Sequence, residues 1–115
     1  AALAWSPDGT QLVSADWNGE LRIWDARKRK SVTEASQPDA VSALTWIEDR
    51  IVTGSWDGRI RVWSIESNQL KLSFSIYTGQ PIHSLVVESS GETAFTVSGD
   101  GNVREWNLIP TTTTE

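Results

Sequence analysis

The chain has 115 residues, no cysteine and a formal net charge of −5 at pH 7. Its length allows one small domain, and its acidic balance argues against general binding to nucleic acid or anionic membranes, which select basic surfaces. The lack of cysteine excludes disulfides and thiolate chemistry. Since no apolar run approaches the roughly 20 residues of a membrane span, we expect a soluble, intracellular protein whose compartment the sequence leaves undetermined.

The first unit, residues 1–36, reads as four short strands joined by turns. An apolar run ends at Trp5, a Ser-Pro-Asp-Gly turn follows, and a second run leads to Asn18-Gly19. Asn-Gly is typical of a two-residue hairpin because both residues tolerate positive φ. A third run ends at Trp24, and the alternating stretch 31–35 predicts a fourth strand.

The second unit, residues 37–77, has the same order of elements. An apolar run ends near Trp46, Asp57-Gly58 forms the hairpin turn, and a further run ends at Trp63. The stretch 69–76 alternates with period two and predicts another fourth strand. We expect Trp5 and Trp46, which occupy the same place in their units, to lie in the core between units.

The third unit, residues 78–109, contains the first three runs but no fourth. Its turn is Asp100-Gly101 and its last apolar run ends at Trp106. The polar tail 110–115 is expected to be disordered. Residue Ala1 aligns inside the first strand of its unit, so the first strand reads as truncated.

These units form an internal repeat. Residues 14–25, 53–64 and 96–107 superimpose without gaps, and their equivalent glycines and tryptophans are 39 and 43 residues apart. A period of about 40 residues is that of propeller blades. No window shows helical periodicity, and strands that are apolar on both faces need a cover on each side. The fold prediction is therefore all-β, in consecutive four-stranded antiparallel units.

The repeat resembles the WD-repeat β-propeller family through Ser-Pro-Asp-Gly at 6–9, GSWDGRIRVW at 54–63 and Trp24-Asp25. The resemblance implies three blades of an incomplete ring, because family rings usually have four to eight blades. It also implies that the remaining blades come from a longer chain or from homo-oligomerisation. Domain boundaries avoid strand interiors, so the truncated first strand favours a fragment.

In the family, a turn Asp, a Ser or Thr, a Trp and a His share hydrogen bonds within each blade. The His does not carry over, since Gln37 and Thr78 stand at its position, and we expect an incomplete network at a cost of about 1 kcal/mol per missing bond. Glu105, aligned with apolar residues of the other copies, is expected to be paired or near solvent. The other three network positions fall on Asn18, Asp57 and Asp100; Ser14, Thr53 and Thr96; and Trp24, Trp63 and Trp106.

The resemblance also implies that partners dock on the face with the turns between second and third strands. Its exposed contact position falls on Trp17, Trp56 and Gly99. The two tryptophans are interpreted either as an aromatic clamp for a peptide or an Arg or Lys side chain, or as rings folded over neighbouring loops to cover the core. Further rim positions that the resemblance implies are Ala40, Ser42, Pro81 and His83, and the carboxylates of Asp16 and Asp39 would suit a basic peptide.

Other chemistry finds little support in the sequence. His83 is the only histidine, so neither a metal site nor a catalytic triad is expected, and no cofactor is implied. The basic run 27–30 is either a patch for an acidic partner or nucleic acid, or a solvated hairpin tip, which is the favoured interpretation. The predicted function is a non-catalytic scaffold that binds a protein or peptide. The alternative is a regulatory or sensor propeller segment of a larger, enzyme-containing chain.

Overall fold

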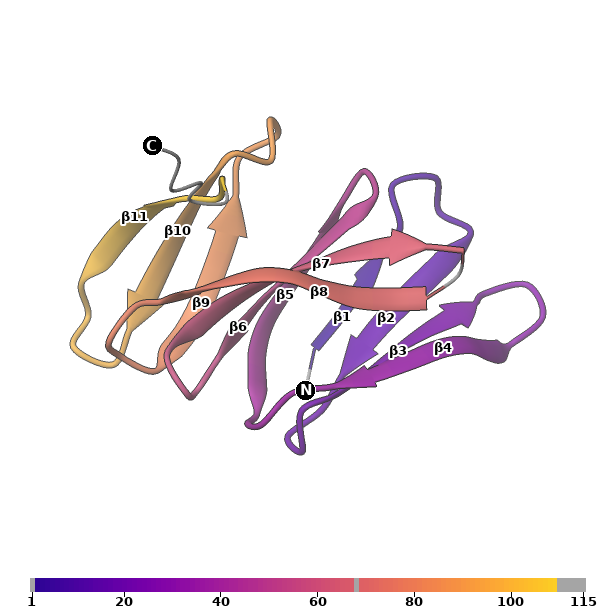
Figure 1. Cartoon of the computed structure of the whole chain (residues 1–115), viewed down its shortest axis with the longest axis horizontal. Coiled ribbons are helices and arrows are strands. Elements are labelled where there is room, and N and C mark those ends of the chain that lie inside the picture. Colours follow the sequence, from indigo (N-terminus) through magenta and orange to yellow (C-terminus); the bar gives the residue numbers. More distant parts are fainter. Residues whose placement is uncertain (1, 68, 110–115) are drawn as a thin grey trace, which may run out of the picture.

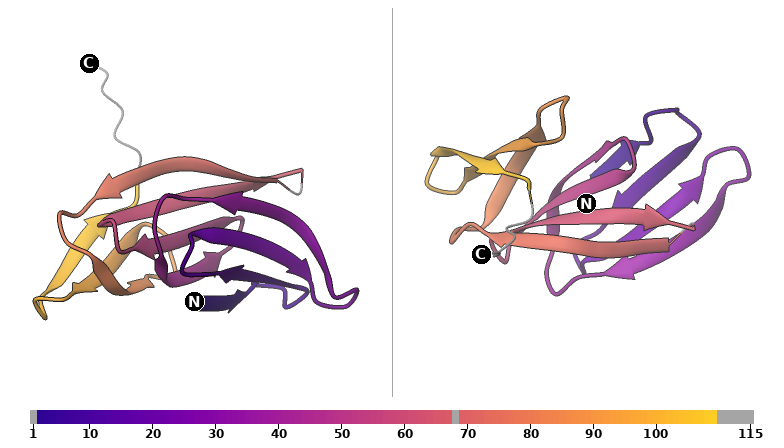
Figure 2. Two further views of the ribbon diagram at one scale, coloured as in Figure 1. Left: turned by 90° about the horizontal axis from the view of Figure 1, so that it is seen from below. Right: turned by 45° about the horizontal axis from the view of Figure 1, so that its top comes forward.

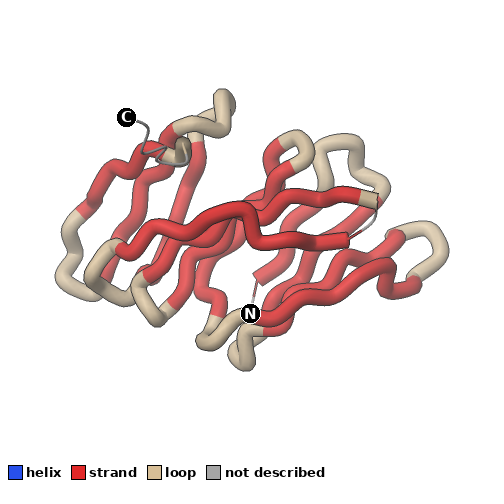
Figure 3. The backbone as a smooth tube through the Cα atoms, viewed as in Figure 1, coloured by secondary structure: helices blue, strands red, loops and turns tan. Residues whose placement is uncertain are grey.

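The computed structural model describes residues 2–67 and 69–109, in which eleven strands form three antiparallel sheets (Figure 3). The described residues include no helix, so none of them forms a helix able to cross a membrane. Each sheet corresponds to one predicted blade. The first blade contains β1 (Ala2–Trp5), β2 (Gln11–Ala15), β3 (Glu20–Asp25) and β4 (Lys30–Ser36); the second contains β5 (Val41–Ile47), β6 (Arg50–Ser55), β7 (Arg59–Glu66) and β8 (Gln69–Tyr77); the third contains β9 (Ile82–Val87), β10 (Thr93–Ser98) and β11 (Val103–Asn107).

The strands within each blade are neighbours in sequence order, as in an antiparallel meander. The fourth strands predicted at 31–35 and 69–76 are present as β4 and β8, and the third blade has three strands among the described residues. The predicted disordered tail 110–115 lies outside the described residues. The fold prediction from the repeat is therefore confirmed as three blades in an open arrangement.

The hairpin turns depend on glycine for two separate reasons. Gly19 and Gly58 both have φ of 85°, a conformation that side chains disfavour. A Cβ added at Gly19 would also overlap the carbonyl oxygen of Gln37. This turn therefore packs directly against the connection that enters the second blade.

The three blades stand side by side in sequence order, as Figure 1 shows and Figure 2 confirms from two other directions. Their first strands pack on one another, β1 against β5 and β5 against β9. Among the described strands, the second blade alone therefore has a neighbouring sheet on both faces.

The core consists of two apolar layers, one in each gap between blades. Side chains from facing sheets meet in each layer, so neither blade could bury its own face alone. The layer between the first and second blades includes Val13, Leu21, Ile23, Trp46 and Trp63, and the layer between the second and third includes Val52, Ile60, Val62, Ile82 and Leu108.

The outer faces of the first and third blades are open. Trp46 is buried as expected, whereas Trp5 is 56% exposed, so the expectation of a core position was wrong for Trp5. The reason is that no described sheet covers the face of the first blade on which it lies. On the third blade Val103 is 65% exposed and Glu105 is near solvent, one of the two alternatives expected for it.

Equivalent positions on covered and open faces give a direct test of this packing. Ile60 is fully buried beneath the third blade, and Val103 occupies the same repeat position on an open face. We expect Ile60→Ala to lower the free energy of unfolding by about 2–5 kcal/mol because it leaves a cavity, and Val103→Ala to change it little. Urea denaturation of both variants measures this, and equal losses would show that the open face is in fact covered.

Candidate functional site

The most regular polar contact joins the second and third strands of each blade. The indole N–H of the tryptophan on the third strand donates to a Ser or Thr hydroxyl ten residues earlier in the chain. In the second and third blades the tryptophan packs against the preceding blade. The three bonds are Trp24 Nε1 to Ser14 Oγ at 2.9 Å, Trp63 Nε1 to Thr53 Oγ1 at 3.1 Å, and Trp106 Nε1 to Thr96 Oγ1 at 2.8 Å.

In the second blade Gln37 takes the place of the family histidine. Its side chain is buried, and its Oε1 accepts a hydrogen bond from Thr53 Oγ1 at 3.3 Å while its Nε2 donates to the Asp39 carbonyl at 2.8 Å. An amide has one donor end and one acceptor end, as a neutral imidazole does. The expectation of an incomplete network is therefore wrong at this link of the second blade.

The third blade differs, because Thr78 is too short for the same role. Its Oγ1 lies 2.8 Å from the carbonyl oxygen of Gly58 and 3.0 Å from that of Gln80, and donates its one hydrogen to either of them. Thr96 keeps its bond from Trp106 but has none from Thr78 among the described contacts. The expected gap in the network is present there.

The turn carboxylates bind arginine instead of joining the Trp and Thr network. Asp57 accepts from Arg61 Nη2 at 2.6 Å and Nη1 at 3.2 Å, and Asp100 accepts from Arg104 Nη2 at 2.9 Å. Arg61 lies directly across the sheet from Thr53, and its guanidinium is bound to the turn carboxylate. This corrects the predicted role of the turn Asp. The overlooked signal was an arginine four residues after the turn in every copy.

These contacts shift the carboxyl pKa values. At Asp57, burial acts to raise the pKa, but the hydrogen bonds from Arg61 and Ser55 outweigh it and the pKa is lowered. At Asp100 the bonds from Arg104 and then Ser98 lower the pKa. Both turns therefore contain ionised carboxylates at neutral pH.

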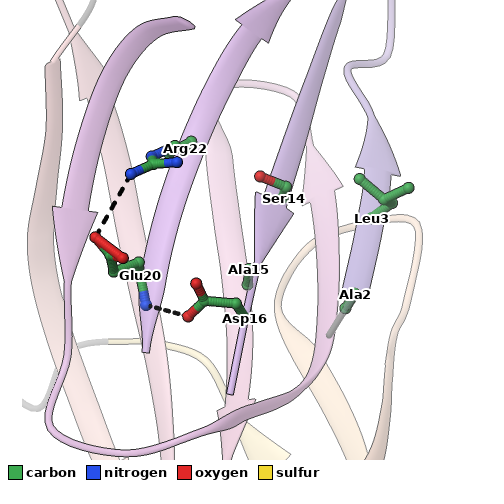
Figure 4. Close-up of a pocket in the computed structure, with 7 residues that line it drawn as sticks. All are labelled: Ala2, Leu3, Ser14, Ala15, Asp16, Glu20 and Arg22. Carbon is green, nitrogen blue, oxygen red and sulfur yellow. Dashed lines mark hydrogen bonds and ion pairs between the residues drawn. The ribbon is translucent and has the colours of Figure 1, made fainter. Parts of the chain in front are cut away.

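The first blade has Asn18 where the others have a carboxylate. Asp16 takes over the turn, accepting from the backbone N–H groups of Asn18 and Glu20 at 2.9 and 3.0 Å. Arg22 forms only long ion pairs, at 3.7 Å to Glu20 and 3.6 Å to Glu34. Figure 4 shows this region, a pocket of about 430 Å³ on the open face of the blade. Its shape follows from the missing cover of that face.

Two tryptophans meet at the rim, where the turns join the second and third strands of the first and second blades. We call Trp17 and Trp56 the rim pair: their ring centroids are 5.0 Å apart, edge to face at 76°. They remain 58% and 45% exposed. Trp56 is anchored by its backbone N–H, which donates to the Ala40 carbonyl at 3.1 Å. Because the rings touch one another, no side chain fits between them, and a partner would contact their outer surfaces.

The other predicted rim residues divide into structural and accessible ones. Ala40 is buried, and the Ser42 hydroxyl contacts the carbonyl oxygens of Gly54 and Ile82, which links the second and third blades. Pro81, His83 and Gly99 are exposed on the third blade. A Cβ at Gly99 would lie 3.2 Å from His83 Nε2, so the imidazole lies where the other blades have their tryptophan. No group of three metal-ligating side chains occurs in the described part of the chain.

Stacked antiparallel sheets with repeated Trp and Ser or Thr bonds define a segment of a β-propeller. The family model for the WD domain, G-beta repeat, matches residues 1–25 and 29–64, and the chain belongs to the WD40-repeat family. Propellers of this family serve in general as protein-interaction scaffolds and are typically non-enzymatic.

Similar proteins are longer than this chain. Actin-interacting protein 1 of Drosophila melanogaster is 30% identical over 110 residues, covering 92% of this chain and 18% of that protein. Telomerase protein component 1 of Mus musculus is 44% identical over 45 residues, covering 39% of this chain and 2% of that protein. A chain in the crystal structure of the mitotic checkpoint complex superposes with a TM-score of 0.82 at 19% identity, over 94% of this chain and 36% of that chain, which shows the fold alone.

Thr53 and Thr96 allow the Gln37 link to be tested by one substitution at two sites. Thr53→Val would leave both Trp63 Nε1 and Gln37 Oε1 without this partner in a buried place, and we expect a loss of about 1–3 kcal/mol in the free energy of unfolding. Thr96→Val removes one partner of a half-buried indole and should cost less. Denaturant titration compares them, and a larger loss at Thr96 would contradict the role given to Gln37.

Because the pKa of Asp57 is lowered in the folded state, we predict that the free energy of unfolding falls at acidic pH. A carboxyl whose folded pKa lies below its unfolded value, 3.8 here, stabilises the fold above that value and loses this contribution as the pH falls through the folded pKa. The stability difference between the wild type and Asp57→Asn should therefore be constant from pH 5 to 8 and shrink below about pH 4. Urea titrations across this range measure it. A difference that stays unchanged to the lowest pH would refute the pairing with Arg61.

Proposed function

We propose that this chain is part of a non-catalytic scaffold that binds a protein or peptide at the rim pair, Trp17 and Trp56. The observation that supports this most is their combination of mutual contact and exposure. The two rings have centroids 5.0 Å apart yet remain about half exposed, and their edge-to-face contact adds only about 0.5–1.5 kcal/mol to folding beyond the area that they bury. Tryptophan is enriched among residues that dominate binding energy.

The chemistry around the rim pair favours a cationic side chain of the partner. Aromatic faces attract a guanidinium or ammonium group, and two carboxylates belong to the same loops. Asp16 is bound by the N–H groups of its own turn, and Asp39 by the backbone N–H of Ala40 at 2.7 Å. Both are held in place by backbone bonds, so they can face a bound cation without reorganising. An arginine- or lysine-containing peptide is the partner that this surface suits.

The rim beyond the pair belongs to the same proposed surface. Pro81, His83 and Gly99 continue it along the third blade, where exposed residues are smaller or more polar. Ala40 and Ser42 support the surface from beneath, through the Trp56 N–H and through the contact with Ile82. We therefore assign partner binding to the three exposed residues of the third blade, and positioning of the surface to Ala40 and Ser42.

A peptide-binding assay on the full-length protein tests the proposal. The probe is a fluorescein-labelled peptide with alternating Arg and Gly, compared with its Gln and Gly counterpart by fluorescence anisotropy. We expect the double variant W17S/W56S to weaken binding of the Arg peptide at least tenfold, because it removes both exposed rings. We expect it to lower the free energy of unfolding by clearly less than the truncation of two buried tryptophans, which costs about 3–5 kcal/mol each.

Two control variants separate binding from folding. Leu72→Ser changes an exposed apolar residue on the outer strand β8 and should leave both binding and stability near wild type. Trp63→Phe removes a buried indole bond and should lower the melting temperature without a specific effect on the peptide. If the loss in W17S/W56S reaches the roughly 3–5 kcal/mol per tryptophan of a buried ring, the rim pair belongs to the core and the proposal fails.

A further inference from the structure

Four of the ten Lys and Arg side chains are consecutive, at residues 27–30, in the turn that joins β3 to β4 and at the first residue of β4. We call this segment the basic hairpin. All four residues are exposed. None of the described carboxylate oxygens lies within 4.0 Å of any of their side-chain nitrogens, and none of these nitrogens donates a hydrogen bond within the described chain. None of the four cations of the hairpin thus forms a direct ion pair within the described chain, although the Asp25 carboxylate lies near Arg27 and Lys28.

This lack of partners is confined to the basic hairpin. Each of the other six cations contacts a carboxylate, a carbonyl, a hydroxyl or an aromatic ring. A protein with fifteen Asp and Glu residues therefore pairs its cations wherever a partner is close, and leaves only this turn unpaired. The six are Arg22, Arg50, Arg59, Arg61, Lys71 and Arg104.

The turn itself is fixed by Asp25, the carboxylate nearest in sequence. Its Oδ1 accepts from the backbone N–H groups of Arg27 and Lys28 at 3.0 and 2.9 Å, and its carbonyl accepts from Arg29 N–H at 2.8 Å. Arg29 has φ of 55°, in the left-handed region. Because Asp25 serves the backbone, the four side chains project from a defined turn and stay available to a partner.

A groove lies beside the basic hairpin. It has a volume of about 350 Å³ and is lined by the turn before β2, Gly9 and Thr10, together with Asp25, Ala26, Arg27 and Lys28. The first strand's turn is held to the hairpin by the Ala26 N–H, which donates to the Thr10 carbonyl at 3.0 Å. The space is at the lower end of what a small bound group needs, and two cations lie at its edge.

We propose that the basic hairpin is a docking site for a short acidic segment of a partner protein, rich in Asp and Glu. Charge complementarity selects this class of partner. A long polyanion such as RNA would extend beyond the hairpin onto a chain with fifteen acidic and six other basic residues, which repels it. A short acidic segment contacts the hairpin alone.

The site is independent of the rim pair. β3 runs from the rim turn at Asn18-Gly19 to the basic hairpin, and its six residues span about 20 Å at 3.3 Å each. In Figure 1 the turn from β3 to β4 lies at the right, far from the turn from β2 to β3 at the bottom. A scaffold with an acidic, aromatic rim and a basic opposite end can thus bind two different segments.

The test measures anisotropy of a fluorescein-labelled hexaglutamate peptide with the full-length protein, at about 50 and 200 mM salt, with hexaglutamine as the neutral probe. We expect hexaglutamate alone to bind, more weakly at the higher salt because the ions screen exposed charges. The variant R27S/K28S/K30S should lose at least tenfold in affinity. Of the matched pair, K28E should weaken binding at least threefold, whereas K71E, which reverses an exposed cation on β8, should change it less than twofold.

Three results would overturn the proposal. Equal losses in K28E and K71E would show that only net charge matters. Tighter binding of hexauridylate RNA or of phosphatidylserine vesicles than of hexaglutamate would identify a different class of partner. Unchanged affinity in R27S/K28S/K30S, with circular dichroism confirming the fold, would place binding elsewhere. The variant W17S/W56S should bind hexaglutamate as the wild type does, so failure of the rim proposal and failure of this one remain distinguishable.

Discussion

The whole structure depends on covering both faces of each sheet. Strands with apolar residues on both sides cannot fold as an isolated blade, because one face would stay in water. The chain meets this constraint by stacking its sheets, so that Val13 and Ile23 of one blade meet Trp63 of the next. The second blade has a neighbouring sheet on both faces, while Trp5 and Val103 mark the faces where no described sheet lies. The turns at the ends of the strands, where partners are proposed to bind, inherit their positions from this stacking.

The repeat made most of the fold predictable, because its signals are local. Asn18-Gly19 and Asp57-Gly58 specify hairpins by backbone conformation alone, and alternation in 69–76 was sufficient to find β8. Hydrogen bonds between residues far apart in the sequence were harder to predict. By sequence, Gln37 occupies a position where the family histidine, and therefore its expected hydrogen bond, is missing. In the structure the Gln37 amide oxygen accepts a hydrogen bond from Thr53, sixteen residues away, because both groups are buried away from water. The sequence gives the residue at each position, but not which of several possible neighbours its side chain will hydrogen-bond in the folded structure.

The candidate site likewise combines features that local sequence predicts with contacts that it does not. The place of Trp17 and Trp56 beside a turn left open whether the rings are exposed or folded over neighbouring loops, and their edge-to-face contact depends on the angle between two blades, which no local pattern contains. Ala40 and Ser42 were expected among contact residues because of their position at the rim, and packing between blades turned them inward. The pairing of turn carboxylates with arginine likewise required the cross-strand register, since Arg61 lies opposite Thr53.

Hydrogen exchange tests the central claim of stacked sheets most directly, because amide protection reports how much of each strand must open before water reaches it. For the 115-residue chain, the account predicts slowest exchange in β6 and β7, whose blade is covered on both faces, and exchange at least tenfold faster in β1 and β11, which belong to the blades with open faces. Uniform protection across all three blades, or slowest exchange in β1 and β11, would contradict it.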